Sequence, residues 1–153
     1  MNSQVIKLIS DETNSFVKQI RENLQSSGTN ATGETSSSLY SKIDDDGQKV
    51  VIEVFGRPYF GTVETGRRPT PDKKPSRGMV ENIKVWLAAR NKPEEMAWAV
   101  AFKINKEGTE LWKKGGRKDI YSEPRDAFVK AISDAVAKEI ADELVEQTAK
   151  AFK

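Results

Sequence analysis

Apolar residues recur every three or four positions at the start of the chain and predict an amphipathic helix over residues 3–25. The stripe consists of Val5, Ile9, Phe16, Ile20 and Leu24, with Leu8 and Val17 beside it. Residues 26–38 are mostly small and polar, so they bury little apolar surface to offset the entropy of ordering. They are expected to form a long flexible loop.

Two runs of alternating apolar and polar residues follow, separated by the sequence Asp-Asp-Asp-Gly at positions 44–47. This pattern predicts an antiparallel hairpin over about residues 38–55, with Gly47 in the turn. The aspartates do not match a calcium-binding loop, because the position that should hold a glutamate is Phe55. Residues 59–64 fit either a short turn of helix or a short third strand.

Two short helices are predicted in the middle of the chain. Ser76 is placed to cap the first, which ends near residue 91, and Pro93 suits the first turn of the second. Gly108 is expected to end that second helix. The tryptophans Trp86 and Trp98 lie within these helices and are expected to be core residues, because large aromatic side chains dominate core burial.

The last segment predicts a helix from residue 124 to residue 152. Apolar residues occur at every fourth position: Phe128, Ile132, Val136, Ile140, Leu144 and, after Thr148, Phe152. Each step of four turns about 40° around a helix with 3.6 residues per turn, so the stripe drifts around the helix. One part is therefore expected to pack on its own domain and another part on a different surface.

These elements predict a single α+β domain over residues 1–153. A small antiparallel sheet is packed by the N-terminal helix, the two middle helices and the long C-terminal helix. The 153 residues include no cysteine and no histidine. Disulfides, thiolate metal sites and catalytic triads with histidine are excluded, and neither a cofactor nor enzymatic activity is expected. No stretch has the length of a membrane span or the pattern of a signal peptide, so a soluble protein is expected.

Positive charge is concentrated in two loops, over residues 65–77 and 109–119. The first is stiffened by three prolines, which lowers the entropy lost on docking. Glu64, which precedes it, is placed to pin it through Arg67 or Arg68. The second carries an aromatic residue beside its cations, a combination suited to an interface anchor or to stacking on a base. The candidate contact residues are Glu64, Arg67, Arg68, Lys73, Lys74, Trp112, Lys113 and Lys114.

Short signatures over residues 31–120 resemble those of small tailed-phage proteins of the head–tail connection and tail-completion type, the HK97 gp10-like family. They are residues 31–33, 37–39, Tyr59, residues 63–69, Pro75, Ile83, Trp86, Ile104, Gly108 and Thr109. The resemblance implies a small sheet flanked by helices, and assembly as a ring of six or twelve copies. It also implies a place in the neck or tail of the virion after assembly in the bacterial cytoplasm.

Two functions are therefore expected from the sequence. The first is a structural ring protein that joins portal or connector proteins to the tail and touches the DNA in the channel through its cationic loops. The alternative is a small monomeric nucleic-acid-binding module that uses the same loops. The acidic excess of the last segment opposes these loops in charge, and such a layout suits head-to-tail contact between copies.

Overall fold

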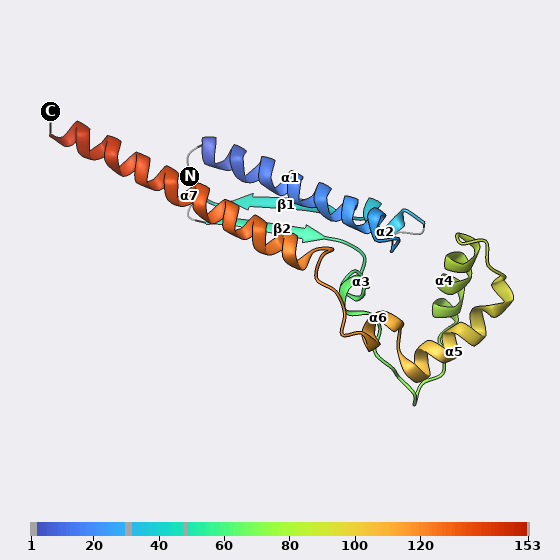
Figure 1. Cartoon of the computed structure of the whole chain (residues 1–153). Coiled ribbons are helices and arrows are strands. Elements are labelled where there is room, and N and C mark those ends of the chain that lie inside the picture. The colour runs from blue at the N-terminus through green and yellow to red at the C-terminus, as the bar shows by residue number, and fades with distance from the viewer. Residues whose placement is uncertain (1–2, 30–31, 48, 153) are drawn as a thin grey trace.

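A computed structural model describes residues 3–29, 32–47 and 49–152 and has the expected α+β architecture (Figure 1). Two antiparallel strands lie beside two long helices, and a pair of shorter helices lies at the far end from the C-terminus. The elements in chain order are α1 (Ser3–Ser26), α2 (Glu34–Ser37), β1 (Tyr40–Asp45), β2 (Val50–Phe55), α3 (Thr62–Thr65), α4 (Arg77–Ala88), the 3-10 turn η1 (Glu94–Met96), α5 (Ala97–Glu107), α6 (Glu110–Lys113) and α7 (Ser122–Ala151).

The predicted hairpin is confirmed. Strand β1 pairs with β2 in a register that sets Ile43 opposite Ile52, and Gly47 has the positive φ of 82° that its turn requires. The rings of Tyr40 and Phe55, also opposite each other, stack with centroids 5.0 Å apart. Residues 59–64 add no third strand in the described structure, because Thr62 begins the short helix α3.

The main core lies where α1 meets the start of α7. The apolar stripe of α1 is buried as predicted, and its second half, from Phe16 to Leu24, packs with Leu39 and Ile120. Phe16 of α1 and Phe128 of α7 stack with their ring centroids 4.7 Å apart and their planes 11° apart. Side chains far apart in the chain therefore close one core, which fixes α7 along α1.

The expectation of a flexible loop over residues 26–38 is wrong for its second half, where α2 forms. Arg21 on α1 holds this segment, with Nε 3.2 Å from the carbonyl oxygen of Ser36 and Nη2 2.6 Å from that of Leu39. Residues 30–31 of the expected loop lie outside the described residues. The sequence pattern missed α2 because the segment is held by hydrogen bonds from Arg21 of the preceding helix α1, which its own composition does not reveal.

The expectation that the two middle helices pack on the sheet is wrong. The helical hairpin of α4 and α5 has a small core of its own, built from Val80, Leu87, Ala97 and Ala101 and separate from the core beside the sheet. Ser76 caps α4 as predicted and accepts a hydrogen bond from the backbone nitrogen of Met79 at 3.2 Å. Gly108 ends α5 with a φ of 78°.

The expectation that Trp86 and Trp98 are core residues is wrong. Their exposed fractions are 41% and 49%. The contact between α4 and α5 is filled by Val80 and Leu87 of α4 and by Ala97 and Ala101 of α5, and neither indole is part of it. Both tryptophans therefore lie on the outside of the helical hairpin.

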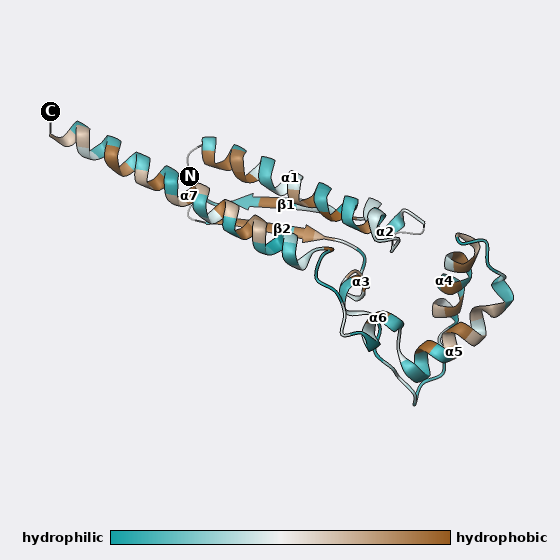
Figure 2. Cartoon of the chain, viewed as in Figure 1, coloured by the Kyte–Doolittle hydropathy of each residue, from teal (hydrophilic) through white to brown (hydrophobic). Residues whose placement is uncertain are grey.

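The long helix α7 begins at Ser122, two residues before the predicted start. Pro124 is buried in its first turn, where a missing N–H group costs no helical hydrogen bond. The helix then extends well past the sheet (Figures 1 and 2). Phe128 is half-buried, whereas Ile140 and Leu144 are 53% and 59% exposed. Packing of the first part on the domain is confirmed, and packing of the last part on another surface stays a prediction.

Candidate functional site

The two cationic loops, 65–77 and 109–119, lie against each other in the fold, and we call them the crossed loops. The backbone nitrogen of Arg67 donates to the hydroxyl of Thr109, and the nitrogen of Thr109 donates to the carbonyl oxygen of Arg67, both at 2.9 Å. Thr109 also caps α6, which occupies residues 110–113 of the predicted second loop. The two loops therefore form one surface.

The end of α5 fixes the apex of the first loop. Asn105, only 3% exposed, donates from its amide nitrogen to the carbonyl oxygen of Lys73 at 2.8 Å. The carbonyl oxygen of Asn105 accepts from the backbone nitrogen of Thr70 at 2.7 Å. The buried residue Asn105 thus holds the backbone of this proline-rich segment at two points. The cationic side chains of the segment therefore project from a backbone that is fixed in place.

Glycine is required where the loops cross. A Cβ atom on Gly66, which has a φ of 69°, would lie 2.4 Å from the backbone nitrogen of Trp112. A Cβ atom on Gly116, with a φ of 84°, would lie 2.8 Å from the carbonyl oxygen of Glu64. Both distances are too short for any side chain, and both φ values favour glycine. The close approach of the loops thus depends on these two glycines.

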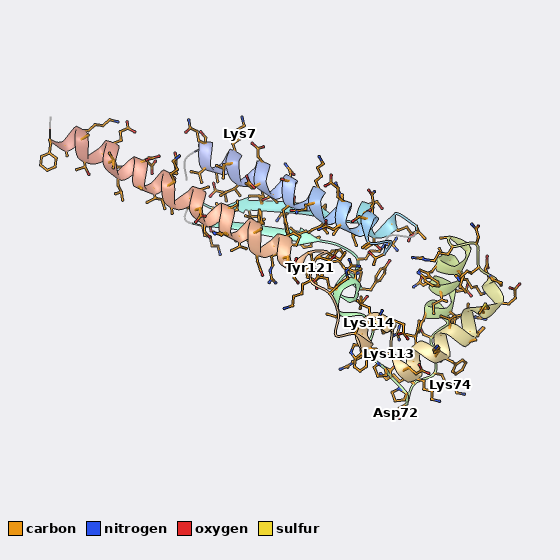
Figure 3. The ribbon with its side chains drawn as sticks, viewed as in Figure 1. Lys7, Asp72, Lys74, Lys113, Lys114 and Tyr121 are labelled. Atoms are coloured by element: carbon orange, nitrogen blue, oxygen red, sulfur yellow. The ribbon has the colours of Figure 1, made fainter. Side chains whose placement is uncertain are left out.

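The crossed loops carry several cations that make no ion pair within the described part of the chain. They are Arg67, Arg68, Lys73, Lys74, Arg77, Lys114 and Lys118. Figure 3 shows Lys74 near Asp72 at the apex of the first loop, with Lys113, the last residue of α6, and Lys114, its C-cap, nearby. The structure therefore brings most of the predicted contact residues to one end of the molecule.

Lys113 differs from these cations because it is neutralised locally. Its ammonium group lies 2.9 Å from Glu107 and 3.0 Å from Glu110, and these bonds raise its pKa while they lower the pKa of both carboxyls. Trp112 is 43% exposed, and its ring packs over Gly108. Lys113 is thus a weaker candidate than the sequence indicated, whereas the Trp112 ring remains accessible in part.

Glu64 has a different role from the predicted one. It is 2% exposed, and its Oε1 accepts from the backbone nitrogens of Ile120, Tyr121 and Ser122 at 3.0, 2.7 and 2.9 Å. Its Oε2 accepts from the hydroxyl of Ser122. Glu64 therefore binds the start of α7 rather than pinning Arg67 or Arg68, and it offers no surface to a partner.

Glu64 lines a pocket of about 480 Å³ between the second crossed loop and the start of α7. Arg117 and Lys118 also line it, and Asp119 holds Arg117 with Oδ1 2.6 Å from its Nε. This pair raises the pKa of Arg117 and lowers that of Asp119. The carboxylate of Glu64 is occupied by its four donors, so it is not free to act as a base on a molecule in the pocket.

A larger cleft of about 810 Å³, which sequence reasoning missed, separates the α4–α5 hairpin from α2 and α3. Its lining includes Trp86 and Val85, both exposed. The sequence predicts a core position for Trp86 of α4 because of its size, and this error concealed the cleft. Residues from four elements form its walls, and only the folded structure places them together.

Among the described residues, no group of three or more histidine, cysteine, aspartate or glutamate side chains could hold a metal ion. Within the same residues, none of the helices is both long enough and apolar enough to cross a membrane. Comparison with known proteins gives no match to any family model, any curated protein or any solved structure.

Proposed function

We propose that this protein is a structural subunit that assembles with copies of itself into a ring. The observation that carries the proposal is the uncovered end of α7. Ile140, Leu144, Val145 and Phe152 are 53%, 59%, 69% and 87% exposed. Apolar side chains gathered on a projecting helix usually mark an interaction surface.

The distribution of charge supports assembly from different surfaces on neighbouring copies. Residues 66–118 hold 14 basic and 6 acidic residues, a net charge of +8. Helix α7 holds 7 acidic and 4 basic residues, a net charge of −3. If two copies met through the same surface, charges of the same sign would face each other. If residues 66–118 of one copy meet α7 of the next, positive charge faces negative charge. Repeated unlike contacts produce a ring when the rotation closes.

The biological setting that we propose is the head–tail junction of a tailed bacteriophage, in the neck or in tail completion. The resemblance over residues 31–120 supports this setting, and the residues that carry it include the crossed loops. In such a ring the crossed loops would touch the next subunit, a portal or tail protein, or the DNA in the channel. Six or twelve copies are the proposed stoichiometries.

Native mass spectrometry and electron microscopy of the purified protein test the proposal. We expect closed rings with one fixed copy number, which become more abundant as the protein concentration rises. Mass spectrometry of purified virions should then recover the chain with the connector and tail components. A strict monomer at every concentration that also never joins particles would overturn the proposal.

The crossed loops support a second candidate function, binding of duplex DNA by a monomer. Unpaired cations fixed on a firm backbone can neutralise successive phosphates, and the released counterions drive such binding. Fluorescence anisotropy with a labelled duplex at low salt tests this function. Binding that weakens steeply with salt is expected, and the absence of binding at low salt would exclude it.

A further inference from the structure

The cleft between the α4–α5 hairpin and the body of the molecule is bounded at both ends by fixed contacts. At one end the Nη2 atom of Arg90 donates to the carbonyl oxygen of Gly28 at 2.7 Å, and its guanidinium group lies 4.4 Å from the ring centroid of Trp86. At the other end lie the paired bonds of Arg67 and Thr109. The cleft is therefore formed before any partner arrives, which lowers the entropy cost of binding.

One wall of this cleft is apolar and accessible. Val85 and Trp86 are 52% and 41% exposed. The apolar lining from α4 and α5 consists of Met79, Ile83, Val85, Trp86, Val100 and Ile104. A volume of about 810 Å³ lies within the range of natural binding pockets. It has room for a few side chains of a partner.

The end of α7 carries apolar side chains that could contact this wall. Residues 140–152 span about 18 Å of helix and present their apolar side chains outward. An amphipathic helix that lays such side chains into a hydrophobic groove is a common mode of protein recognition. Phe152 is the most exposed of these side chains, and aromatic residues are frequent interface anchors.

A chain cannot fill its own cleft with this helix. The free end of α7 and the α4–α5 hairpin lie at opposite ends of the molecule (Figure 1). Charge also favours a second copy as the occupant, because acidic Asp142 and Glu143 accompany the apolar residues of α7, whereas Glu146 is paired with Lys150 on the same helix at 2.6 Å. Arg67 lines the cleft, and Arg68 lies in the adjacent crossed loop.

We infer that the end of α7 from one copy of this chain docks in the α4–α5 cleft of a second copy, with the acidic residues of α7 facing the crossed loops. This inference rests on the proposed self-assembly and names the two surfaces that meet. Because donor and receptor lie at opposite ends of one chain, each docked copy offers a free cleft or a free helix to the next.

Cross-linking between single cysteines tests the inference, because the natural sequence contains no cysteine that would react. Phe152→Cys marks the helix end and Val85→Cys marks the cleft, both at exposed positions. The two variants are mixed and treated with a short bis-maleimide. We expect a covalent dimer that contains one copy of each variant, and a ladder of larger species from the double variant.

Val51→Cys is the matched control, since Val51 is an exposed valine on the hairpin, away from the cleft. A second experiment compares the assembly of the Val85→Glu variant with that of the Val51→Glu variant. The far-ultraviolet circular dichroism of both variants is compared with that of the natural protein to check that they fold. We expect Val85→Glu to weaken assembly at least about tenfold while Val51→Glu leaves it unchanged.

Assembly without a preference for the 85–152 link would overturn this inference and leave the proposed ring intact. Equal weakening of assembly by the two glutamate variants would also overturn it. A strict monomer would overturn both the inference and the proposed function.

Discussion

Glu64 binds Ser122 through both of its carboxylate oxygens. Oε1 accepts from the backbone nitrogen of Ser122 at 2.9 Å, and Oε2 accepts from its hydroxyl. The two residues are 58 positions apart. The N-terminal N–H groups of a helix lack partners within the helix and carry a partial positive charge, so a carboxylate suits this place. One buried side chain thus joins the segment before the first crossed loop to the start of α7.

Replacement of Glu64 by alanine should destabilise the fold. Three backbone N–H groups and one hydroxyl would lose their acceptor, so the free energy of unfolding should fall by about 2–4 kcal/mol. Urea unfolding followed by circular dichroism measures the change. Glu143→Ala, at an exposed position, is the control and should change this free energy by less than about 0.5 kcal/mol. Equal stability of the two variants would contradict the assigned role of Glu64.

The neighbouring glycines 115 and 116 should respond differently to alanine. Their φ values are 85° and 84°, so either substitution forces alanine into the left-handed region, at about 1 kcal/mol. The new Cβ atom meets nothing within 4 Å at Gly115 but lies 2.8 Å from the carbonyl oxygen of Glu64 at Gly116. Gly116→Ala should therefore lower the unfolding free energy by about 1 kcal/mol more. Urea denaturation of both variants measures the difference, and equal losses would contradict the close approach.

Elements that are stabilised by residues close to one another in the chain could be predicted from the sequence. The α1 stripe, the hairpin and the Ser76 cap each depend on residues within a few positions of one another. The position of α7 along α1 depends on the pair Phe16 and Phe128, which are separated by more than 100 residues. A periodic pattern shows that a face is apolar but not what covers it.

The candidate site could be predicted in part for the same reason. The cations of the crossed loops are visible in the sequence, but their joint surface depends on the bonds of Arg67 with Thr109. Glu64 was assigned to Arg67 and Arg68 because sequence separation made that pairing simplest. The sequence predicts Trp86 in the core because large aromatic side chains dominate core burial, but Val80, Leu87, Ala97 and Ala101 fill the α4–α5 contact without it.

The two halves of α7 should separate stability from assembly. Phe128→Ala removes the ring that stacks on Phe16, so the free energy of unfolding should fall by about 2–3 kcal/mol. Leu144→Ser removes an exposed side chain and should change it by less than about 0.5 kcal/mol, while the oligomer dissociates. Urea unfolding and light scattering after size exclusion measure the two effects. An unchanged oligomer in Leu144→Ser would argue against assembly through the end of α7.

The crossed loops should control any binding of duplex DNA. Arg67→Ala together with Arg68→Ala removes two cations without ion pairs in the described structure, so the slope of log K against log salt should flatten by about 2. Lys113→Ala is the control, because Glu107 and Glu110 already neutralise this lysine, and its effect should be smaller. Fluorescence anisotropy over a salt series measures the slopes. If Lys113→Ala flattened the slope as much as each arginine substitution does, the ion pairs of Lys113 with Glu107 and Glu110 would have no influence on DNA binding.

Tyr121 should make stability depend on alkaline pH. Burial raises its pKa above the ordinary value of 10.0, and the negative charge of Glu64 raises it further, against a smaller opposite effect of Arg125. The folded chain then keeps the phenol proton at a pH where the unfolded chain has lost it. The contribution is complete below pH 10.0 and is lost as the pH rises through the folded pKa. Urea unfolding at a series of pH values should show a shallower alkaline loss for Tyr121→Phe than for the natural protein. Tyr40→Phe, which removes an exposed tyrosine, is the control, and identical slopes for both variants would contradict the burial of the Tyr121 phenol.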